Sequence, residues 1–139
     1  MVAKVAYLFV RDRDERGHLD LARFLAHIGD VLLQAVSASD RHWRVKYIAH
    51  AAGRDVYPLE LRNEAEGNFD MVPDELVRLV GIQDQFIGDL HVVEDSTGLE
   101  FGLFDSTFLF VRGPQSLCEA VIEPFEEVEL GHGPIESPW

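Results

Sequence analysis

The chain has 139 residues, of which 47% are hydrophobic and 27% are charged, and its formal net charge is −13. This composition excludes a disordered chain, and the length fits one domain spanning 1–139. No apolar run approaches the roughly 20 residues of a membrane-spanning helix, so no membrane partner is expected. Cys118 has no second cysteine to pair with, and no secretion signal opens the chain. Both features predict a cytoplasmic protein.

The negative charge is concentrated in the second half of the chain. Residues 1–63 hold ten Lys and Arg against eight acids, a net charge of +2. Residues 64–139 hold two Arg against 17 acids, a net charge of −15. A surface of that sign repels phosphate backbones and favours encounter with a basic partner. The alternative is that the acids serve only to keep the protein in solution.

The first half predicts a strand, a long helix and two further strands. Residues 2–10 are almost all apolar, which is typical of a strand buried on both faces. Apolar side chains recur at helical spacing over residues 19–36, so this helix covers a sheet with one stripe. Residues 43–48 alternate with the period of a strand. Residues 57–61 alternate again and predict an edge or bulged strand, because Pro58 lacks an N–H.

The middle of the chain predicts a loop, a short helix and a hairpin. Residues 63–70 are expected to form the loop. Residues 73–80 open with Pro and two acids, as a first helical turn often does, and continue at helical spacing. Residues 90–94 and 99–103 flank Asp95-Ser96-Thr97-Gly98, a turn sequence that ends in glycine. These two segments therefore predict an antiparallel hairpin.

The last third predicts one more strand of a meander, a helix and a final strand. Residues 107–112 continue the hairpin as a third strand, and residues 114–123 follow as a helix that Pro124 ends. Residues 125–130 alternate as a strand. The remaining residues, 131–139, are expected to form a tail or a loop that docks by Trp139.

These elements predict an α+β fold. They include too few crossover helices for a doubly wound parallel sheet. An antiparallel or mixed β-sheet is expected, with one long N-terminal helix (about 19–36) and a C-terminal helix (about 114–123) packed on it.

No motif in the chain predicts a catalytic residue, a cofactor or a metal. Nucleophile elbows, phosphate-binding glycine loops and dinucleotide fingerprints are all missing from the sequence. The segment from Asp12 begins like a calcium loop, but Arg16 and Arg23 stand where oxygen ligands are needed. A solvated loop is therefore favoured. The alternative is a magnesium site formed by Asp12, Asp14 and His18.

A small basic patch lies on the strand predicted at 43–48 and just before it. It consists of Arg41, His42, Arg44 and Lys46. The net charge of −13 argues against nucleic acid as its partner, and we expect the patch to pair with acids of the chain itself.

The candidate partner-binding residues are acids of the second half. They lie on the last predicted helix, on the adjoining strand and in the meander. If they converge on one face, they create a field suited to a cationic protein surface. These residues are Glu94, Asp95, Asp105, Glu119, Glu123, Glu126, Glu127 and Glu129.

A small, acidic, cytosolic α+β chain of this kind resembles bacterial toxin-immunity proteins in general character. The resemblance implies an inhibitor that neutralises a basic partner, such as a nuclease or another nucleic-acid-targeting toxin. Two alternatives stay open. One is a self-associating structural or regulatory domain, in which the near-neutral half of one copy meets the acidic half of another. The other is a small metal-dependent enzyme that uses Asp12, Asp14 and His18.

Overall fold

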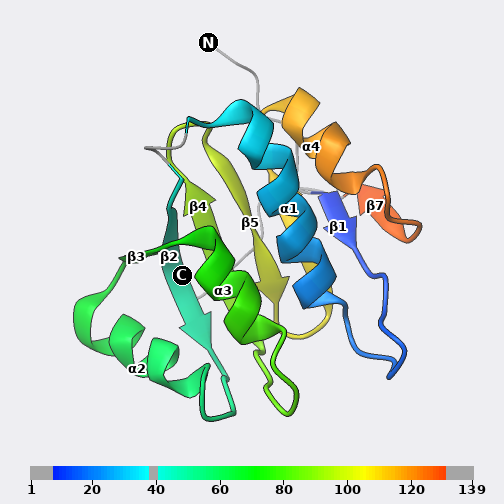
Figure 1. Ribbon diagram of the computed structural model, residues 1–139. Helices are drawn as coiled ribbons and strands as arrows, with labels where there is room; N and C mark the ends of the chain where they lie inside the picture. Colours follow the sequence, from blue (N-terminus) through cyan, green and yellow to red (C-terminus); the bar gives the residue numbers. More distant parts are fainter. Residues whose placement is uncertain (1–7, 38–40, 131–139) are drawn as a thin grey trace.

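The computed structural model describes residues 8–37 and 41–130, and Figure 1 shows their arrangement. The strands are β1 (Leu8–Val10), β2 (Trp43–Ala49), β3 (Phe69–Met71), β4 (Asp89–Glu94), β5 (Leu99–Phe104), β6 (Phe108–Arg112) and β7 (Val128–Leu130). The helices are α1 (Leu21–Ala35), α2 (Tyr57–Glu66), α3 (Pro73–Val80) and α4 (Gln115–Ile122). Residues 1–7 and 131–139, which include the first part of the predicted 2–10 strand and the predicted tail, lie outside this description.

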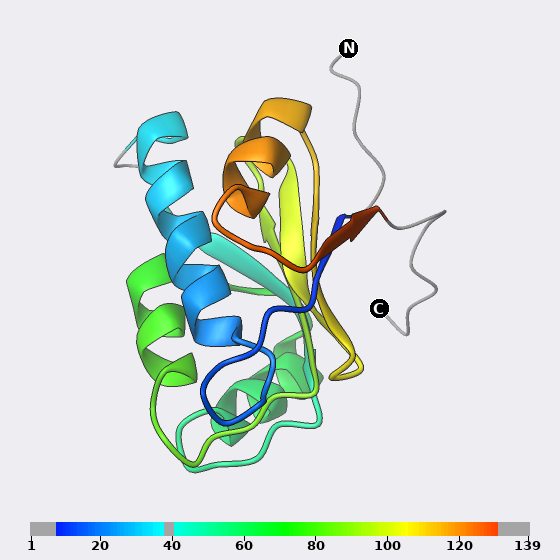
Figure 2. The same ribbon diagram turned by 90° about the vertical axis from the view of Figure 1, so that its right-hand side faces the viewer.

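The seven described strands form one sheet in the order β3-β2-β4-β5-β6-β1-β7, and every neighbouring pair is antiparallel. Helices α1, α3 and α4 cover one face of this sheet, as the side view in Figure 2 shows. Helix α2 lies beside the β2–β3 edge and contacts both strands. The predicted α+β fold with an antiparallel sheet is therefore confirmed. Among the described helices, none has the length and apolar character to cross a membrane.

Helix α1 supplies the central part of the helix layer. Asp20 caps its start by accepting the N–H of Arg23 at 3.3 Å. Its apolar stripe is buried, and the helix contacts β5, α3 and α4. Fully burying each such side chain stabilises the fold by about 1.5–3 kcal/mol. The buried stripe consists of Leu21, Phe24, Leu25, Ile28 and Leu32.

The β4–β5–β6 meander contains the predicted antiparallel hairpin and the predicted third strand. Leu90 faces Leu103 and Glu94 faces Leu99 across the first hairpin, with the predicted turn between them. Strand β6 then pairs with β5 along its length. Alternate residues point toward the helices and form the sheet side of the core, as the strand period requires. Those on β4 and β5 are Leu90, Val92, Leu99, Phe101 and Leu103, all buried.

The predicted strand at 57–61 is wrong, because the chain forms helix α2 there. Pro58 lies in the first turn of this helix, where its missing N–H leaves no hydrogen bond unmade. The alternation of Tyr57, Leu59 and Leu61 was misleading, since no residue of α2 is fully buried and the helix needs no continuous apolar stripe. The predicted loop at 63–70 is also wrong, since it contains the end of α2 and the start of β3.

Side chains of α2 replace a neighbouring strand along part of β2. Strand β3 pairs only with Trp43 to Val45. Beyond that point, the N–H of Ile48 donates to Asn63 Oδ1 at 3.2 Å, and the N–H of Ala51 donates to Glu60 Oε1 at 2.8 Å. Asn63 also donates to the carbonyl of Gly67 at 2.9 Å, just past the helix end. The helix thus satisfies backbone groups that an open sheet edge would leave exposed.

We expect Asn63→Ala to lower the free energy of unfolding by about 1–3 kcal/mol, because it leaves the half-buried N–H of Ile48 without its acceptor. Urea unfolding followed by circular dichroism would measure this loss. Glu64→Ala is the matched control on the same helix, and as a surface change it should stay within about 0.5 kcal/mol of the wild type. Equal stability of the two variants would contradict this role for Asn63.

Candidate functional site

The eight acids predicted to bind a partner do not gather in one place. Glu94 and Asp95 lie at the β4–β5 turn, and Asp105 lies at the β5–β6 turn. Strand β5 separates these turns by six residues, or about 20 Å of extended chain. The remaining five lie on α4 and in the segment from α4 to β7. The structure therefore divides the predicted set into two turns and one stretch of chain.

Glu94 serves the fold of its own turn. Its side chain is 2% exposed, and it accepts the backbone N–H of Ser96 at 2.9 Å and that of Thr97 at 2.8 Å. The hydroxyls of Ser96 and Thr97 donate to the same carboxylate. Burial by itself would raise the pKa of Glu94, but these four donors outweigh it and lower the pKa. Glu94 is therefore an ionised turn cap with very little surface free for a partner.

Asp95 is paired with a cation of the predicted basic patch. Arg44 donates from Nη2 to Asp95 Oδ1 at 2.9 Å and from Nε to Oδ2 at 3.1 Å. This two-point hydrogen bond lowers the pKa of Asp95. The prediction that the patch pairs with the chain's own acids is confirmed for Arg44. Asp105 is exposed, and its N–H donates to Asp89 Oδ1 at 2.8 Å.

The other five acids follow one another in the chain from α4 to β7, and we call them the α4–β7 acidic surface. All five are exposed, and Glu129 pairs with Arg11 at 2.7 Å. Within the described residues, the other four make no ion pair. The two arginines of the second half pair with acids outside this group: Arg78 pairs with Glu75, and Arg112 lies 3.9 Å from Glu100. The α4–β7 acidic surface consists of Glu119, Glu123, Glu126, Glu127 and Glu129.

Asp12 anchors this surface to the rest of the fold. Its Oδ1 accepts the N–H of Glu127 at 2.8 Å, and its Oδ2 accepts that of Glu126 at 3.1 Å. Arg23 lies 3.8 Å from Asp12 Oδ2 and also donates to the carbonyl of Pro124 at 3.0 Å. These bonds tie the loop before α1 to the segment between α4 and β7. The backbone that carries Glu126 and Glu127 is therefore held in place.

The magnesium site considered for Asp12, Asp14 and His18 does not form. Asp12 is committed to the backbone of Glu126 and Glu127, as above. Asp14 Oδ1 accepts the N–H groups of His18 and Arg16, at 3.0 and 2.9 Å, and the bond from His18 contributes most to lowering the pKa of Asp14. In residues 8–37 and 41–130, no group of three or more His, Cys, Asp or Glu could hold a metal ion.

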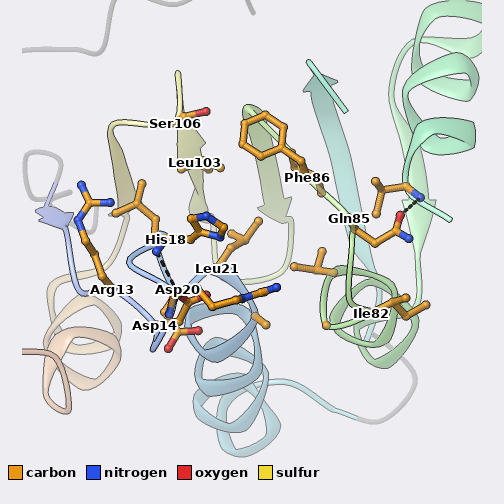
Figure 3. Close-up of a pocket in the computed structure, with 17 residues that line it drawn as sticks. Arg13, Asp14, His18, Asp20, Leu21, Ile82, Gln85, Phe86, Leu103 and Ser106 are labelled. Atoms are coloured by element: carbon orange, nitrogen blue, oxygen red, sulfur yellow. Dashed lines mark hydrogen bonds between the residues drawn. The ribbon is translucent and has the colours of Figure 1, made fainter. Parts of the chain in front are cut away.

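A cavity of about 320 Å³, which we call the β1–α1 cavity, opens beside the loop between β1 and α1 (Figure 3). Arg13, Asp14, Arg16 and His18 of that loop line one part of it. The segment from α3 to β4 lines another part, including Gln85 and the exposed ring of Phe86. Sequence reasoning missed it as a pocket, because its walls come from segments far apart in the chain. The one feature of the sequence that indicated this site was the run of charged residues at 11–16.

A second hollow of about 400 Å³ lies between α1 and α3, and we call it the α1–α3 groove. Leu33 and Val72 stand beside it with half or more of their surface exposed, 50% and 60%. Three acids, Asp30, Asp74 and Glu94, also line it, together with one cation, Arg41. The groove therefore combines accessible apolar surface with negative charge.

The face of the sheet that carries no described helix holds a buried histidine. His91 Nε2 lies 3.1 Å from Glu100 Oε1, and burial is the main cause that lowers the pKa of His91. Its ring packs against Phe110 across Gly102, where an added Cβ would lie 1.9 Å from the carbonyl oxygen of Leu90. Because His91 is 2% exposed, a substrate cannot reach it.

Cys118 is buried on α4 and belongs to the hydrophobic core. Burial raises the pKa of its thiol to about 11. The thiol is therefore protonated at neutral pH and a poor nucleophile.

Comparison of the chain with protein-family models, with curated proteins and with solved structures finds no match. The function has to follow from the residues described above.

We expect Glu94→Gln to lower the free energy of unfolding at pH 7 by about 1–3 kcal/mol, because the amide cannot accept from all four donors of the turn. The folded-state pKa of Glu94 lies below its ordinary value of 4.5. The carboxylate's contribution is therefore present above pH 4.5 and is lost as the pH falls through the lowered value.

Urea unfolding at several pH values would measure both effects. The difference between wild type and Glu94→Gln should be largest near neutral pH and should shrink in acid. Glu123→Gln, an exposed acid with no ion pair among the described residues, is the control and should change stability little. A difference that grows as the pH falls would show that the turn does not hold an ionised Glu94.

Proposed function

We propose that the chain is a protein-binding module that captures a basic protein through the α4–β7 acidic surface. Such a module would act as an inhibitor or immunity-type protein, and a nucleic-acid-targeting toxin is the kind of partner it fits. The observation that carries the proposal is the group Glu119, Glu123, Glu126 and Glu127. These four carboxylates are exposed, and no cation of the described chain pairs with them.

Electrostatics explains why such a surface favours a cationic partner. Carboxylates that lie within a short stretch of chain and have no paired cation repel one another, and a basic partner relieves this repulsion when it docks. The same field speeds the encounter of the two proteins, by as much as 10–10³-fold at low ionic strength. A toxin that binds nucleic acid presents a cationic surface for phosphates, and carboxylates of the inhibitor could occupy it.

A tight complex also needs an apolar anchor, because exposed charges contribute more to the rate of encounter and to specificity than to affinity. The α1–α3 groove offers such a contact. It lies in the helix layer that also contains α4, and its three acids outnumber its one cation, Arg41, so its net charge has the same sign as that of the α4–β7 acidic surface. An aliphatic or aromatic side chain flanked by Lys or Arg would complement it.

Self-association remains the second candidate from the sequence, and the described sheet edges offer it little support. Strands β3 and β7, at the two edges, have three residues each. A ladder built on the described part of either edge strand would be short.

We expect the variant Glu119→Gln, Glu123→Gln, Glu126→Gln, Glu127→Gln to lose capture of the partner, because it removes four charges and preserves the shape of the surface. The measurement is affinity purification from the native cell at about 50 and 300 mM salt, a range over which screening weakens exposed charge pairs. Wild type should recover a basic protein at low salt and less of it at high salt.

The control must change the net charge equally at another place. Glu15→Gln, Glu64→Gln, Asp70→Asn and Asp84→Asn together do so at exposed positions. This control should recover the same protein as the wild type. Recovery of that protein by the α4–β7 variant would contradict the proposed surface, and failure of wild type to recover any basic protein would contradict the proposed function. A homodimer that persists at both salt concentrations in light scattering would favour self-association instead.

A further inference from the structure

The β1–α1 cavity combines an apolar lining with two arginines that form no ion pair with a described residue. Leu21, Val56, Ile87 and Leu103 line it and are buried, so they are fixed by the core. Its volume of about 320 Å³ lies within the usual range of small-molecule pockets. The cavity therefore has room for an apolar body of modest size.

Two arginines at this cavity differ from most cations of the chain. Six of the eleven Lys and Arg residues that the structure describes make ion pairs with the chain's own acids. Arg13 and Arg16 make none with any described residue. Arg13 donates from Nη1 to the carbonyl of Gly17 at 2.9 Å, which positions it but leaves its charge unbalanced. The chain has about twice as many acids as Lys and Arg residues, so acids to pair with are plentiful. The presence of two arginines without an ion pair at one cavity therefore calls for an explanation.

The acids at the cavity are already satisfied by the backbone. Asp14 accepts the N–H groups of Arg16 and His18, as described above. Asp20 caps α1 and lies at the positive end of the helix dipole. Backbone N–H groups thus take up hydrogen-bonding capacity of both carboxylates, whereas neither guanidinium group forms an ion pair with a described acid. An added negative charge would be attracted to Arg13 and Arg16.

The opposite wall offers an aromatic contact and a rigid support. Phe86 is 53% exposed, and its backbone exchanges two hydrogen bonds of 2.8 Å with Ala52. Gln85 Oε1 accepts the N–H groups of Asp55 and Val56, each at 3.2 Å, which holds this wall against the segment before α2. In the view of Figure 3, His18 lies between Arg13 on one side and Gln85 on the other.

We propose that the β1–α1 cavity is a binding site for a small amphiphilic anion, a carboxylate with an aromatic or aliphatic body. The body would pack on the apolar lining and against Phe86, and the carboxylate would accept hydrogen bonds from Arg16 and Arg13. Charged hydrogen bonds of this kind are the strong ones in proteins. None of the five residues of the α4–β7 acidic surface lines this cavity, so the two proposals stand independently.

Three probes with the same ring test the charge preference: phenylacetate, phenylacetamide and 2-phenylethylammonium. Each is titrated into the ¹⁵N-labelled full-length protein, and amide shifts are followed by NMR. Phenylacetate should bind most tightly, with the largest shifts at Gly17, Gly81 and Ser106. The neutral amide should bind about tenfold more weakly, which is the usual loss when a charged hydrogen bond is removed. Amides of the β4–β5 turn should not move.

Arg16→Gln should weaken phenylacetate binding by about tenfold. Arg54→Gln is the matched control, because Arg54 is exposed, makes no ion pair with a described residue and does not line the cavity. It should bind phenylacetate as the wild type does. Unchanged amide spectra outside the cavity show that each variant is folded.

Equal binding of the three probes, tighter binding of the ammonium, or shifts spread over the whole molecule would overturn the proposal. The lack of any shift at Gly17, Gly81 and Ser106 up to 10 mM phenylacetate would also overturn it. A dissociation constant of 10 mM corresponds to a binding free energy of roughly −2.7 kcal/mol. Loss of partner capture by the α4–β7 variant bears on the proposed function alone and leaves this test unaffected.

Discussion

The packing of α1 against the sheet is the interaction on which the rest of the structure depends. An antiparallel sheet must bury one face, and the stripe from Leu21 to Leu32 supplies the centre of the cover. Helices α3 and α4 contact α1 from its two sides, so α1 positions both. The start of α1 adjoins the β1–α1 cavity, and its last turns line the α1–α3 groove. Every candidate binding feature on this face of the molecule therefore takes its position from one helix.

The shortage of cations is the second constraint. With 12 Lys and Arg against 25 acids, ion pairs inside the chain cannot neutralise the acids. The structure instead satisfies several carboxylates with backbone N–H groups. Glu94 caps a turn, Asp14 closes a loop, and Asp12 holds the segment that leads to β7. The acids that lack such donors are the exposed ones, and the α4–β7 acidic surface is where four of them remain unpaired.

Sequence patterns were reliable where one stripe or one face is buried over many residues. Helix α1 and the β4–β5 hairpin have such patterns. The turn between the two strands is also recognisable, because its sequence is polar and ends in glycine. The pattern failed at α2, because a helix that buries no residue fully carries no apolar period. Strand β3 was missed because three residues are too few to show alternation, and its pairing with β2 decides its structure.

The candidate sites also include some that the sequence could predict and some that it could not. Glu119 and Glu123 lie four residues apart, so a predicted helix brings them to one face, and the segment after it adds its acids by proximity in sequence. Glu94 could not be recognised as a turn cap, since its exposure depends on how the β4–β5 turn closes over it. The β1–α1 cavity could not be predicted, because its walls come from loops whose meeting is set by the packing of α1 and α3.

An acidic surface and a cavity that carries two arginines are compatible in one chain, because they act over different distances. At 0.1 M salt, screening reduces interactions between exposed charges beyond about 10 Å. A small anion bound beside Arg13 and Arg16 feels mainly those two cations and the carboxylates of Asp14 and Asp20, whose oxygens accept backbone N–H groups. A large basic partner contacts many charges at once and responds to the surplus of acids. The net charge of −13 slows the arrival of an anion, whereas the groups that line the cavity determine how strongly the anion is held once it arrives.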